Sequence, residues 1–260
     1  MAGALAAIAD ASTRAGFREW LLRVADDELI IGHRHSEWTG FGPDIESDVA
    51  FSSIAQEEVG HARAFYAQIT AGEGDDEDHL AFARLPGEYR HAVLVERENG
   101  EWEWSIVRLV LYERFDAVRL GLLAASAQDP FAGLARTLLR EERYHTLFAE
   151  AWLTRLARGG GDGRARVQAA LDAAWPDALG LFEDTDVDAR LAAAGILQGS
   201  PDALRTAWAA AVRPVLESSG LRIPSTPART GGRRGQHTPE FDRLHAQMTE
   251  VWRSEPGARW

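Results

Sequence analysis

The spacing of apolar residues along the chain predicts a helical protein. Apolar positions recur three and four residues apart over long stretches, and the apolar–polar alternation that is typical of strands is scarce. We predict four long helices at residues 12–37, 44–71, 103–127 and 130–158. We predict shorter helices at about residues 164–182, 201–218 and 239–253.

The connections between these helices indicate how they are arranged. The first and second helices are joined by a short link, as are the third and fourth, so each pair should be antiparallel, whereas residues 72–102 form a long crossover. Within the crossover, residues 91–102 have the pattern of a hairpin with Asn99 and Gly100 at the turn. The glycine-rich segment 158–163 has the composition of a hinge. We therefore expect an all-α, ferritin-like four-helix bundle with additional C-terminal helices.

Composition and charge narrow the classes of function. A chain of this length can bury one sizeable core, and we expect a single ferritin-like domain over residues 1–260, with the core bundle at about 12–158 and a helical extension at about 164–255. The formal net charge of −12 argues against binding to nucleic acid or to anionic membranes. No apolar run is long enough to span a membrane, and the first residues lack the basic start of a signal peptide, so we expect a cytoplasmic protein.

Two short motifs carry the candidate chemistry. The stretch "EEVGH" ends at His61 and the stretch "EERYH" ends at His145, and each lies in a predicted long helix. In both, a glutamate stands three positions before the histidine, namely Glu58 and Glu142. Residues three apart lie on one face of a helix, so each pair of side chains can reach one metal ion. Because the chain has no cysteine, a metal site would have to use Glu, Asp and His.

Two further glutamates complete the pattern. Glu28 lies on the apolar face of the first helix, 30 residues before Glu58, and Glu113 lies on that of the third helix, 29 residues before Glu142. Matching positions in the two halves are 84 or 85 residues apart, so the arrangement is duplicated within the chain. One Glu from each of two helices with Glu-x-x-His from each of two others is the ligand set of carboxylate-bridged dimetal proteins. The predicted ligands are Glu28, Glu58, His61, Glu113, Glu142 and His145.

Three other acidic residues remain open as alternative ligands or as groups that support the ligands. Glu57 and Glu141 precede their histidines by four positions, which is also a same-face spacing, and Asp116 follows Glu113 by three. Carboxylates and imidazoles suit two iron ions, two manganese ions or one of each. No flavin or nicotinamide motif is found in the chain, so electrons for redox chemistry would come from a separate reductase.

Longer stretches of the chain resemble a known family. They are "HRHSEWTGFGPDIESDVAF" (33–51), "AGEGDDEDHLAFAR" (71–84), "EERYH" (141–145) and "RTGGRRGQHTPEF" (229–241). On these residues the chain resembles the phenylacetic acid catabolic (PaaA/PaaC) family of ferritin-like proteins, and it is nearest to the C type. The stretches run from the first helix nearly to the C-terminus, so the resemblance covers almost the whole chain.

The resemblance implies a place in a multicomponent phenylacetyl-CoA epoxidase. The resemblance implies that the A-type subunit is the catalytic di-iron component, which epoxidises the aromatic ring with dioxygen and electrons from a reductase. The C type pairs with it as a supporting subunit that has lost metal ligands. This chain departs from the C type because all six predicted ligand positions are occupied by ligand residues.

Three functions therefore remain open. We expect a C-type epoxidase subunit that acts in phenylacetate catabolism, pairs with an A-type subunit and keeps a complete dimetal-carboxylate site. The alternatives are an oxygenase that itself acts on an aromatic or acyl-CoA substrate, and ferritin- or rubrerythrin-like handling of iron or peroxide. A homodimer is a further assembly that the sequence leaves open.

The stretch "RTGGRRGQH" supplies one more candidate site. Its arginines Arg229, Arg233 and Arg234 surround two glycines and would suit the phosphates of a CoA ester or an acidic surface of a partner. The alternative is a solvated loop whose arginines balance the acidic protein. We favour the contact with a partner.

Overall fold

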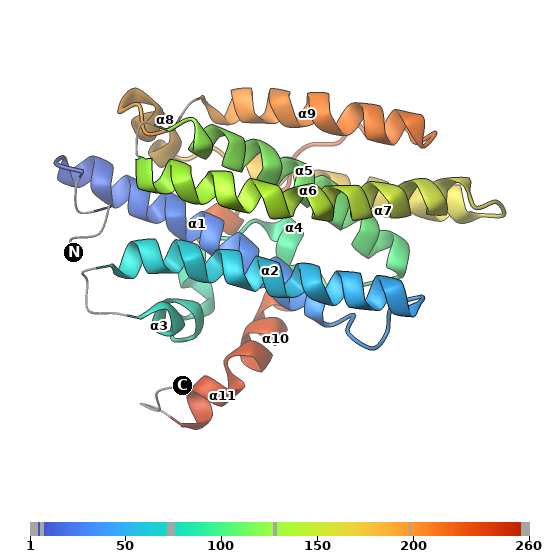
Figure 1. Cartoon of the computed structure of the whole chain (residues 1–260), viewed down its shortest axis with the longest axis horizontal. Coiled ribbons are helices and arrows are strands. Elements are labelled where there is room, and N and C mark those ends of the chain that lie inside the picture. Colours follow the sequence, from blue (N-terminus) through green and yellow to red (C-terminus); the bar gives the residue numbers. More distant parts are fainter. Residues whose placement is uncertain (1–4, 6–7, 72–75, 127–128, 198, 256–260) are drawn as a thin grey trace. The chain divides into compact units, whose positions relative to one another are not determined.

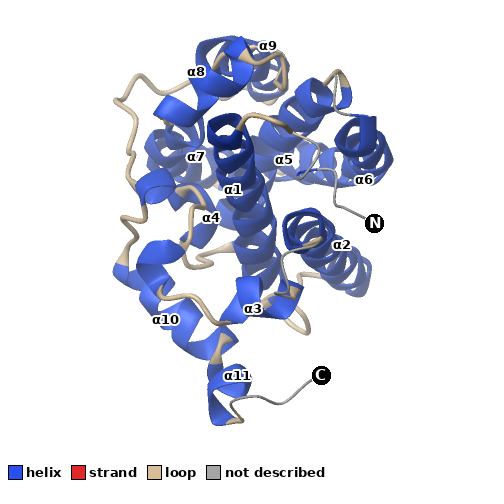
Figure 2. Ribbon diagram, turned by 90° about the vertical axis from the view of Figure 1, so that its left-hand side faces the viewer, coloured by secondary structure: helices blue, strands red, loops and turns tan. Residues whose placement is uncertain are grey.

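The computed structural model describes residues 5, 8–71, 76–126, 129–197 and 199–255. Among these residues none lies in a strand, as the ribbon in Figure 2 shows. The chain divides into two compact units, which we treat separately: unit 1 consists of Met1–Glu98 and Gly231–Trp260, and unit 2 consists of Asn99–Thr230. Within the described residues, no helix is both long enough and apolar enough to cross a membrane.

Unit 1 is built around two long helices, α1 (Ala11–Ser36) and α2 (Ile45–Thr70), which pack along each other (Figure 1). Each begins at an aspartate whose side chain accepts a hydrogen bond from a backbone N–H of the first turn, as such N-caps do. The helices approach closely at Gly32, where a Cβ atom would lie 2.9 Å from a methyl carbon of Val59. The absence of a side chain at Gly32 therefore lets α1 and α2 approach each other beside the predicted ligands.

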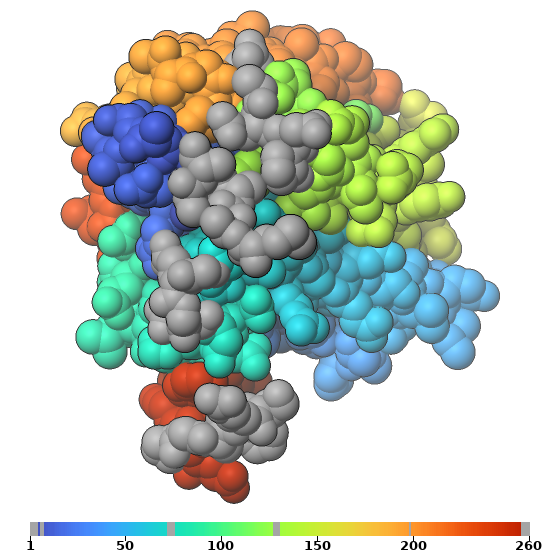
Figure 3. All heavy atoms as spheres, turned by 60° about the vertical axis from the view of Figure 1, so that its left-hand side comes forward, coloured from blue at the N-terminus to red at the C-terminus, as the bar shows by residue number. Residues whose placement is uncertain are grey.

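The rest of unit 1 consists of short helices, which come from both of its sequence segments. They are α3 (Glu77–Phe82), η2 (Pro86–Glu88), α4 (Val93–Glu96), η4 (Gly232–Arg234), α10 (Pro239–Met248) and α11 (Glu250–Ser254). Helix α4 packs on α1, and α10 packs on α4 and η2. In Figure 3 the red spheres of α10 and α11 lie directly below the green segment that contains α3. The C-terminal residues thus return to pack on elements that precede them by more than a hundred positions.

Unit 2 contains the second pair of long helices and the helices that cover it. Its elements are α5 (Trp102–Ala124), α6 (Asp129–Arg158), α7 (Gly163–Leu179), η3 (Gly180–Phe182), α8 (Asp186–Ala193) and α9 (Pro201–Ser218). Helices α5 and α6 pack along each other, α7 contacts both, and α9 contacts α5. The buried Trp208 indole fixes α9 on α5 by donating a hydrogen bond of 3.0 Å to the Leu111 carbonyl.

The predicted long helices are confirmed, with ends that differ by three residues at most. The predicted hairpin at residues 91–102 is wrong. Val93, Leu94 and Val95 lie in the short helix α4 and all are buried, so their apolar run reflects burial on every side rather than a strand. Asn99 does not form a hairpin turn; its side chain accepts hydrogen bonds from the first turns of α5 instead.

Candidate metal centre

In unit 1 the helix pair α1 and α2 brings together three of the predicted ligands. Glu28 projects from α1, while Glu58 and His61 project from one face of α2. The Nδ1 atom of His61 lies 3.8 Å from Oε2 of Glu28 and 3.9 Å from Oε2 of Glu58. All three residues are buried, with exposed fractions of 2% or less. We call this group the α1–α2 cluster.

The helix pair α5 and α6 of unit 2 repeats the arrangement. Glu113 projects from α5, and Glu142 and His145 project from α6. The Nδ1 atom of His145 lies 3.3 Å from Oε2 of Glu113 and 3.5 Å from Oε1 of Glu142. These residues are also buried, with exposed fractions of 1% or less. We call this group the α5–α6 cluster.

The geometry of each cluster fits a bound cation. In both, one imidazole nitrogen faces carboxylates from two helices at 3.3–3.9 Å. Ligand atoms that each lie about 2.1 Å from one ion are separated from one another by about 3–4 Å. In the α5–α6 cluster, neither buried oxygen of Glu113 accepts a hydrogen bond from a described residue. Buried carboxylates need a positive charge or a proton nearby, and a divalent ion supplies that charge.

Comparison with known proteins places the chain in a family. A family model described as "Phenylacetic acid catabolic protein" matches residues 5–260. The chain belongs to this family. It is 34% identical over 244 residues to the C subunit of 1,2-phenylacetyl-CoA epoxidase from Escherichia coli (strain K12), an alignment that covers 93% of this chain and 98% of that protein.

A solved structure of another protein has a similar fold to this member of the phenylacetic acid catabolic family. Protein 19 with aldehyde deformylating oxidase activity from Synechococcus matches it with a TM-score of 0.62 at 20% sequence identity, over 82% of this chain and 93% of that one. This likeness confirms the predicted all-α, ferritin-like fold.

The three acidic residues left open by the sequence lie outside the two clusters. Glu57 and Glu141 are half-buried rather than buried on the apolar face of their helices. Asp116 is buried, but its Oδ1 atom accepts hydrogen bonds from Arg119, which also donates to the Tyr112 hydroxyl at 3.2 Å. The carboxylate of Asp116 is therefore occupied by a guanidinium.

The sequence pattern missed two buried aspartates that directly precede Glu28. Asp26 accepts hydrogen bonds from the Tyr66 hydroxyl at 2.6 Å, from the Arg84 guanidinium and from the Arg90 backbone N–H at 2.7 Å. Burial alone would raise the pKa of Asp26, but the adjacent Arg84 and these hydrogen bonds outweigh it and lower the pKa. Asp27 forms a separate ion pair with an arginine of the C-terminal segment. Three consecutive acidic residues within the otherwise apolar stretch 24–31 were the available signal for this buried network.

The structure corrects one part of the arginine prediction. Arg233 is only 5% exposed, and its guanidinium donates two hydrogen bonds of 2.8 Å to the carboxylate of Asp27. The charge of Arg233 is thus paired with Asp27 inside the protein and does not face a partner or a CoA phosphate. Arg229 is half-exposed and pairs with Asp177 at 2.6 Å, and Arg234 is exposed. A contact with a partner through these two arginines stays a prediction.

Proposed function

We propose that this protein is the C-type subunit of a multicomponent phenylacetyl-CoA ring epoxidase and that it holds a dimetal site of its own. Membership of the family and the identity to the C-type component of such an epoxidase support the first part. The observation that carries the second part is the repeated cluster, in which an imidazole nitrogen faces two buried carboxylates from neighbouring helices.

We infer further that the α1–α2 and α5–α6 clusters each hold one of two metal ions. The matching sequence offsets support this inference, because duplicated Glu and Glu-x-x-His helices are the arrangement that dimetal carboxylate bundles use. Six ligand residues with four carboxylates suit iron or manganese, in either a uniform or a mixed pair. When bound, such ions supply the redox chemistry that activates dioxygen.

The residues of the chain would hold the ions and keep water away from them. The four glutamates would offset the charge of two divalent ions, and each histidine would supply a nitrogen ligand. All six side chains are at most 2% exposed, so bulk water would have little access to the ions. The buried Asp26 and Asp27 networks fix the helical turn that carries Glu28.

The partner in this proposal is an A-type subunit, and electrons come from a separate reductase. The alternative is that the chain itself oxidises an aromatic or acyl-CoA substrate, because both clusters are complete. Reconstitution distinguishes the two functions.

The first test measures metal. After anaerobic loading with ferrous iron and removal of free iron, we expect two metal ions per chain by elemental analysis. Glu142→Ala removes a proposed ligand carboxylate and should lower the metal content, whereas the neighbouring Glu141→Ala serves as the matched control and should not. Absence of bound iron and manganese in the folded wild-type protein would rule out the dimetal site.

The second test measures substrate oxidation after the protein is combined with the A-type subunit and the reductase. If Glu142→Ala leaves the rate unchanged, turnover belongs to the partner and the site in this chain is not catalytic. If the wild-type chain oxidises substrate with the reductase alone, the alternative function is correct. If the A-type subunit with the reductase loses its activity when this chain is omitted, the result supports the subunit function.

A further inference from the structure

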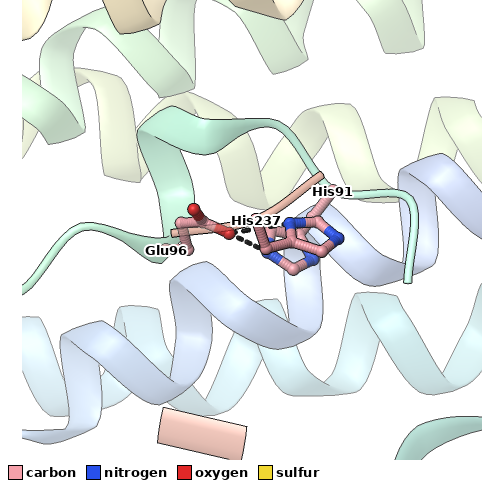
Figure 4. Close-up of side chains that lie close together, drawn as sticks. All are labelled: His91, Glu96 and His237. Carbon is pink, nitrogen blue, oxygen red and sulfur yellow. Dashed lines mark hydrogen bonds and ion pairs between the residues drawn. The ribbon is translucent and has the colours of Figure 1, made fainter. Parts of the chain in front are cut away.

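A second group of histidine and glutamate side chains lies in unit 1 and includes none of the predicted ligands. Glu96 at the end of α4 faces two stacked imidazoles, that of His91, which precedes α4, and that of His237, which comes from the C-terminal segment (Figure 4). Oε2 of Glu96 is 2.7 Å from Nε2 of His91 and 2.8 Å from Nδ1 of His237. The three side chains are buried, at 3% exposure or less. We call this group the His–Glu–His cluster.

The contacts of the cluster fix the number of protons that it holds. Nε2 of His237 lies 3.1 Å from the Tyr89 carbonyl oxygen, which can only accept, so this nitrogen must carry a proton. The contact between Nδ1 of His237 and Glu96 needs a second proton, and the contact of His91 with the same oxygen needs a third. The other oxygen of Glu96 accepts from the Thr238 backbone N–H at 2.7 Å. Two neutral imidazoles and a carboxylate supply only two of these three protons.

The local electrostatics place the additional proton. Burial alone would raise the pKa of Glu96, but the hydrogen bonds from His237 and His91 outweigh it and lower the pKa to about 2, so the carboxyl group is ionised. Burial is the largest cause that lowers the pKa of His91 to about 4, so this ring is neutral and donates through Nε2. Both ring nitrogens of His237 face an oxygen, so His237 is the position that offers a place for the third proton.

A metal ion would satisfy the same charge requirement, but the ring geometry favours a proton. The imidazoles of His91 and His237 are stacked, with centroids 4.1 Å apart and planes inclined by only 17°. The lone pair of a ligating nitrogen lies in its ring plane, and two stacked, nearly parallel planes do not meet at one ion. Metal-bound histidines also donate their other ring N–H to a partner, and Nδ1 of His91 has no hydrogen-bond partner among the described residues. A proton requires no rearrangement.

The charged groups of neighbouring elements have hydrogen-bond partners other than the two imidazoles, and Asp26, whose charge also acts on His91, accepts from Arg84. Arg34 of α1 donates to the backbone carbonyl of Glu96 at 2.7 Å and 3.0 Å, and to that of Glu240 at 3.1 Å. The carboxylate of Glu240 accepts from Arg97 and from a backbone N–H. His245 of α10 faces a backbone carbonyl at 2.8 Å. Thus Glu96 provides the carboxylate that the His237 ring contacts.

We propose that His237 is an imidazolium in the folded protein and that its two N–H groups fasten residues 231–238 to Glu96 of α4 and to the Tyr89 carbonyl, which makes the docking of the C-terminal segment depend on this proton. The attachment joins residues 141 positions apart, because Glu96 and His237 belong to the two separate segments of the unit 1 sequence. Loss of the proton leaves one ring nitrogen with a lone pair that faces an oxygen. This inference does not depend on the proposed function.

The direct test uses the wild-type chain with isotope-labelled histidine. Ring-nitrogen chemical shifts distinguish an imidazolium from the neutral tautomers, and His237→Gln assigns the His237 signals by their disappearance. At about one pH unit above the ordinary histidine pKa of about 6.5, we expect both nitrogens of His237 to be protonated. Neutral-tautomer shifts for His237 at that pH would overturn the proposal. So would one equivalent of added Zn²⁺ that shifts the signals of both His91 and His237, because the cluster would then be a metal site.

A variant test separates the charge from the shape of the cluster. Glu96→Gln keeps the size of the side chain but removes its charge, so His237 should lose its second proton. Hydrogen exchange of the α10 amides should accelerate on the order of 10- to 100-fold in this variant, the effect of one unsatisfied buried polar group. The exposed His79→Gln serves as the control and should leave α10 exchange unchanged. An imidazolium that persists in Glu96→Gln would show that the pair with Glu96 does not hold the proton.

Discussion

The ion pair between Arg233 and Asp27 makes the sharpest prediction about stability. Both side chains are buried, with exposed fractions of 4% and 0%, and they share two hydrogen bonds of 2.8 Å. In Arg233→Met the guanidinium is lost, and the Asp27 carboxylate loses both of these hydrogen bonds while it keeps the one of 2.8 Å from the Ala92 backbone N–H. Removing one partner of a buried pair costs about 3–5 kcal/mol, because the other charge stays buried without compensation. We expect this loss in the free energy of unfolding from urea titration at neutral pH.

The neighbouring Arg234 supplies a matched control, because it is exposed and has the same side chain. Arg234→Met should change the free energy of unfolding by no more than about 0.5 kcal/mol. Adding Asp27→Asn to Arg233→Met removes the stranded charge and should restore part of the loss. A loss in Arg233→Met no larger than that in Arg234→Met would refute the argument that this pair fastens the C-terminal segment to α1.

Two further predictions concern backbone geometry and acid. Gly235 has a φ of +75° and a Cβ there would lie 2.1 Å from the Gly87 carbonyl oxygen, so Gly235→Ala should lower the free energy of unfolding by at least about 1–3 kcal/mol. Gly60→Ala, in an open helical position, should instead raise it by up to about 1 kcal/mol, and equal effects in urea titrations would contradict this reasoning. Because the pKa of His91 falls from 6.5 to about 4 on folding, the unfolded chain binds the proton first, and stability should drop by about 3 kcal/mol as pH falls from 6.5 to 4. Glu96, whose pKa falls from 4.5 to about 2, should extend the loss below pH 4.5, and His91→Asn should flatten the upper part of this profile in acid-unfolding measurements.

The long helices and the two Glu-x-x-His pairs of the clusters could be predicted from local sequence. Helical periodicity is a property of residues three and four apart, so the long helices were predicted to within three residues of their ends. The pairs Glu58 with His61 and Glu142 with His145 are likewise local, since one turn of helix places both members on one face. The predicted hairpin failed because a short apolar run does not distinguish a strand from a buried turn of helix.

The sequence by itself determined the all-α class, the four long helices, the duplicated carboxylate and histidine pattern, and the resemblance to the family. The tertiary structure alone decided where the remaining charges go. Arg233 was predicted to face a partner, yet it pairs with Asp27, which is 206 residues away, and His237 meets Glu96 across 141 residues. Contacts of this range leave no periodic signal in the sequence, because they depend on how separate helices pack. A buried ion pair and an exposed arginine therefore look the same until the fold brings their partners together.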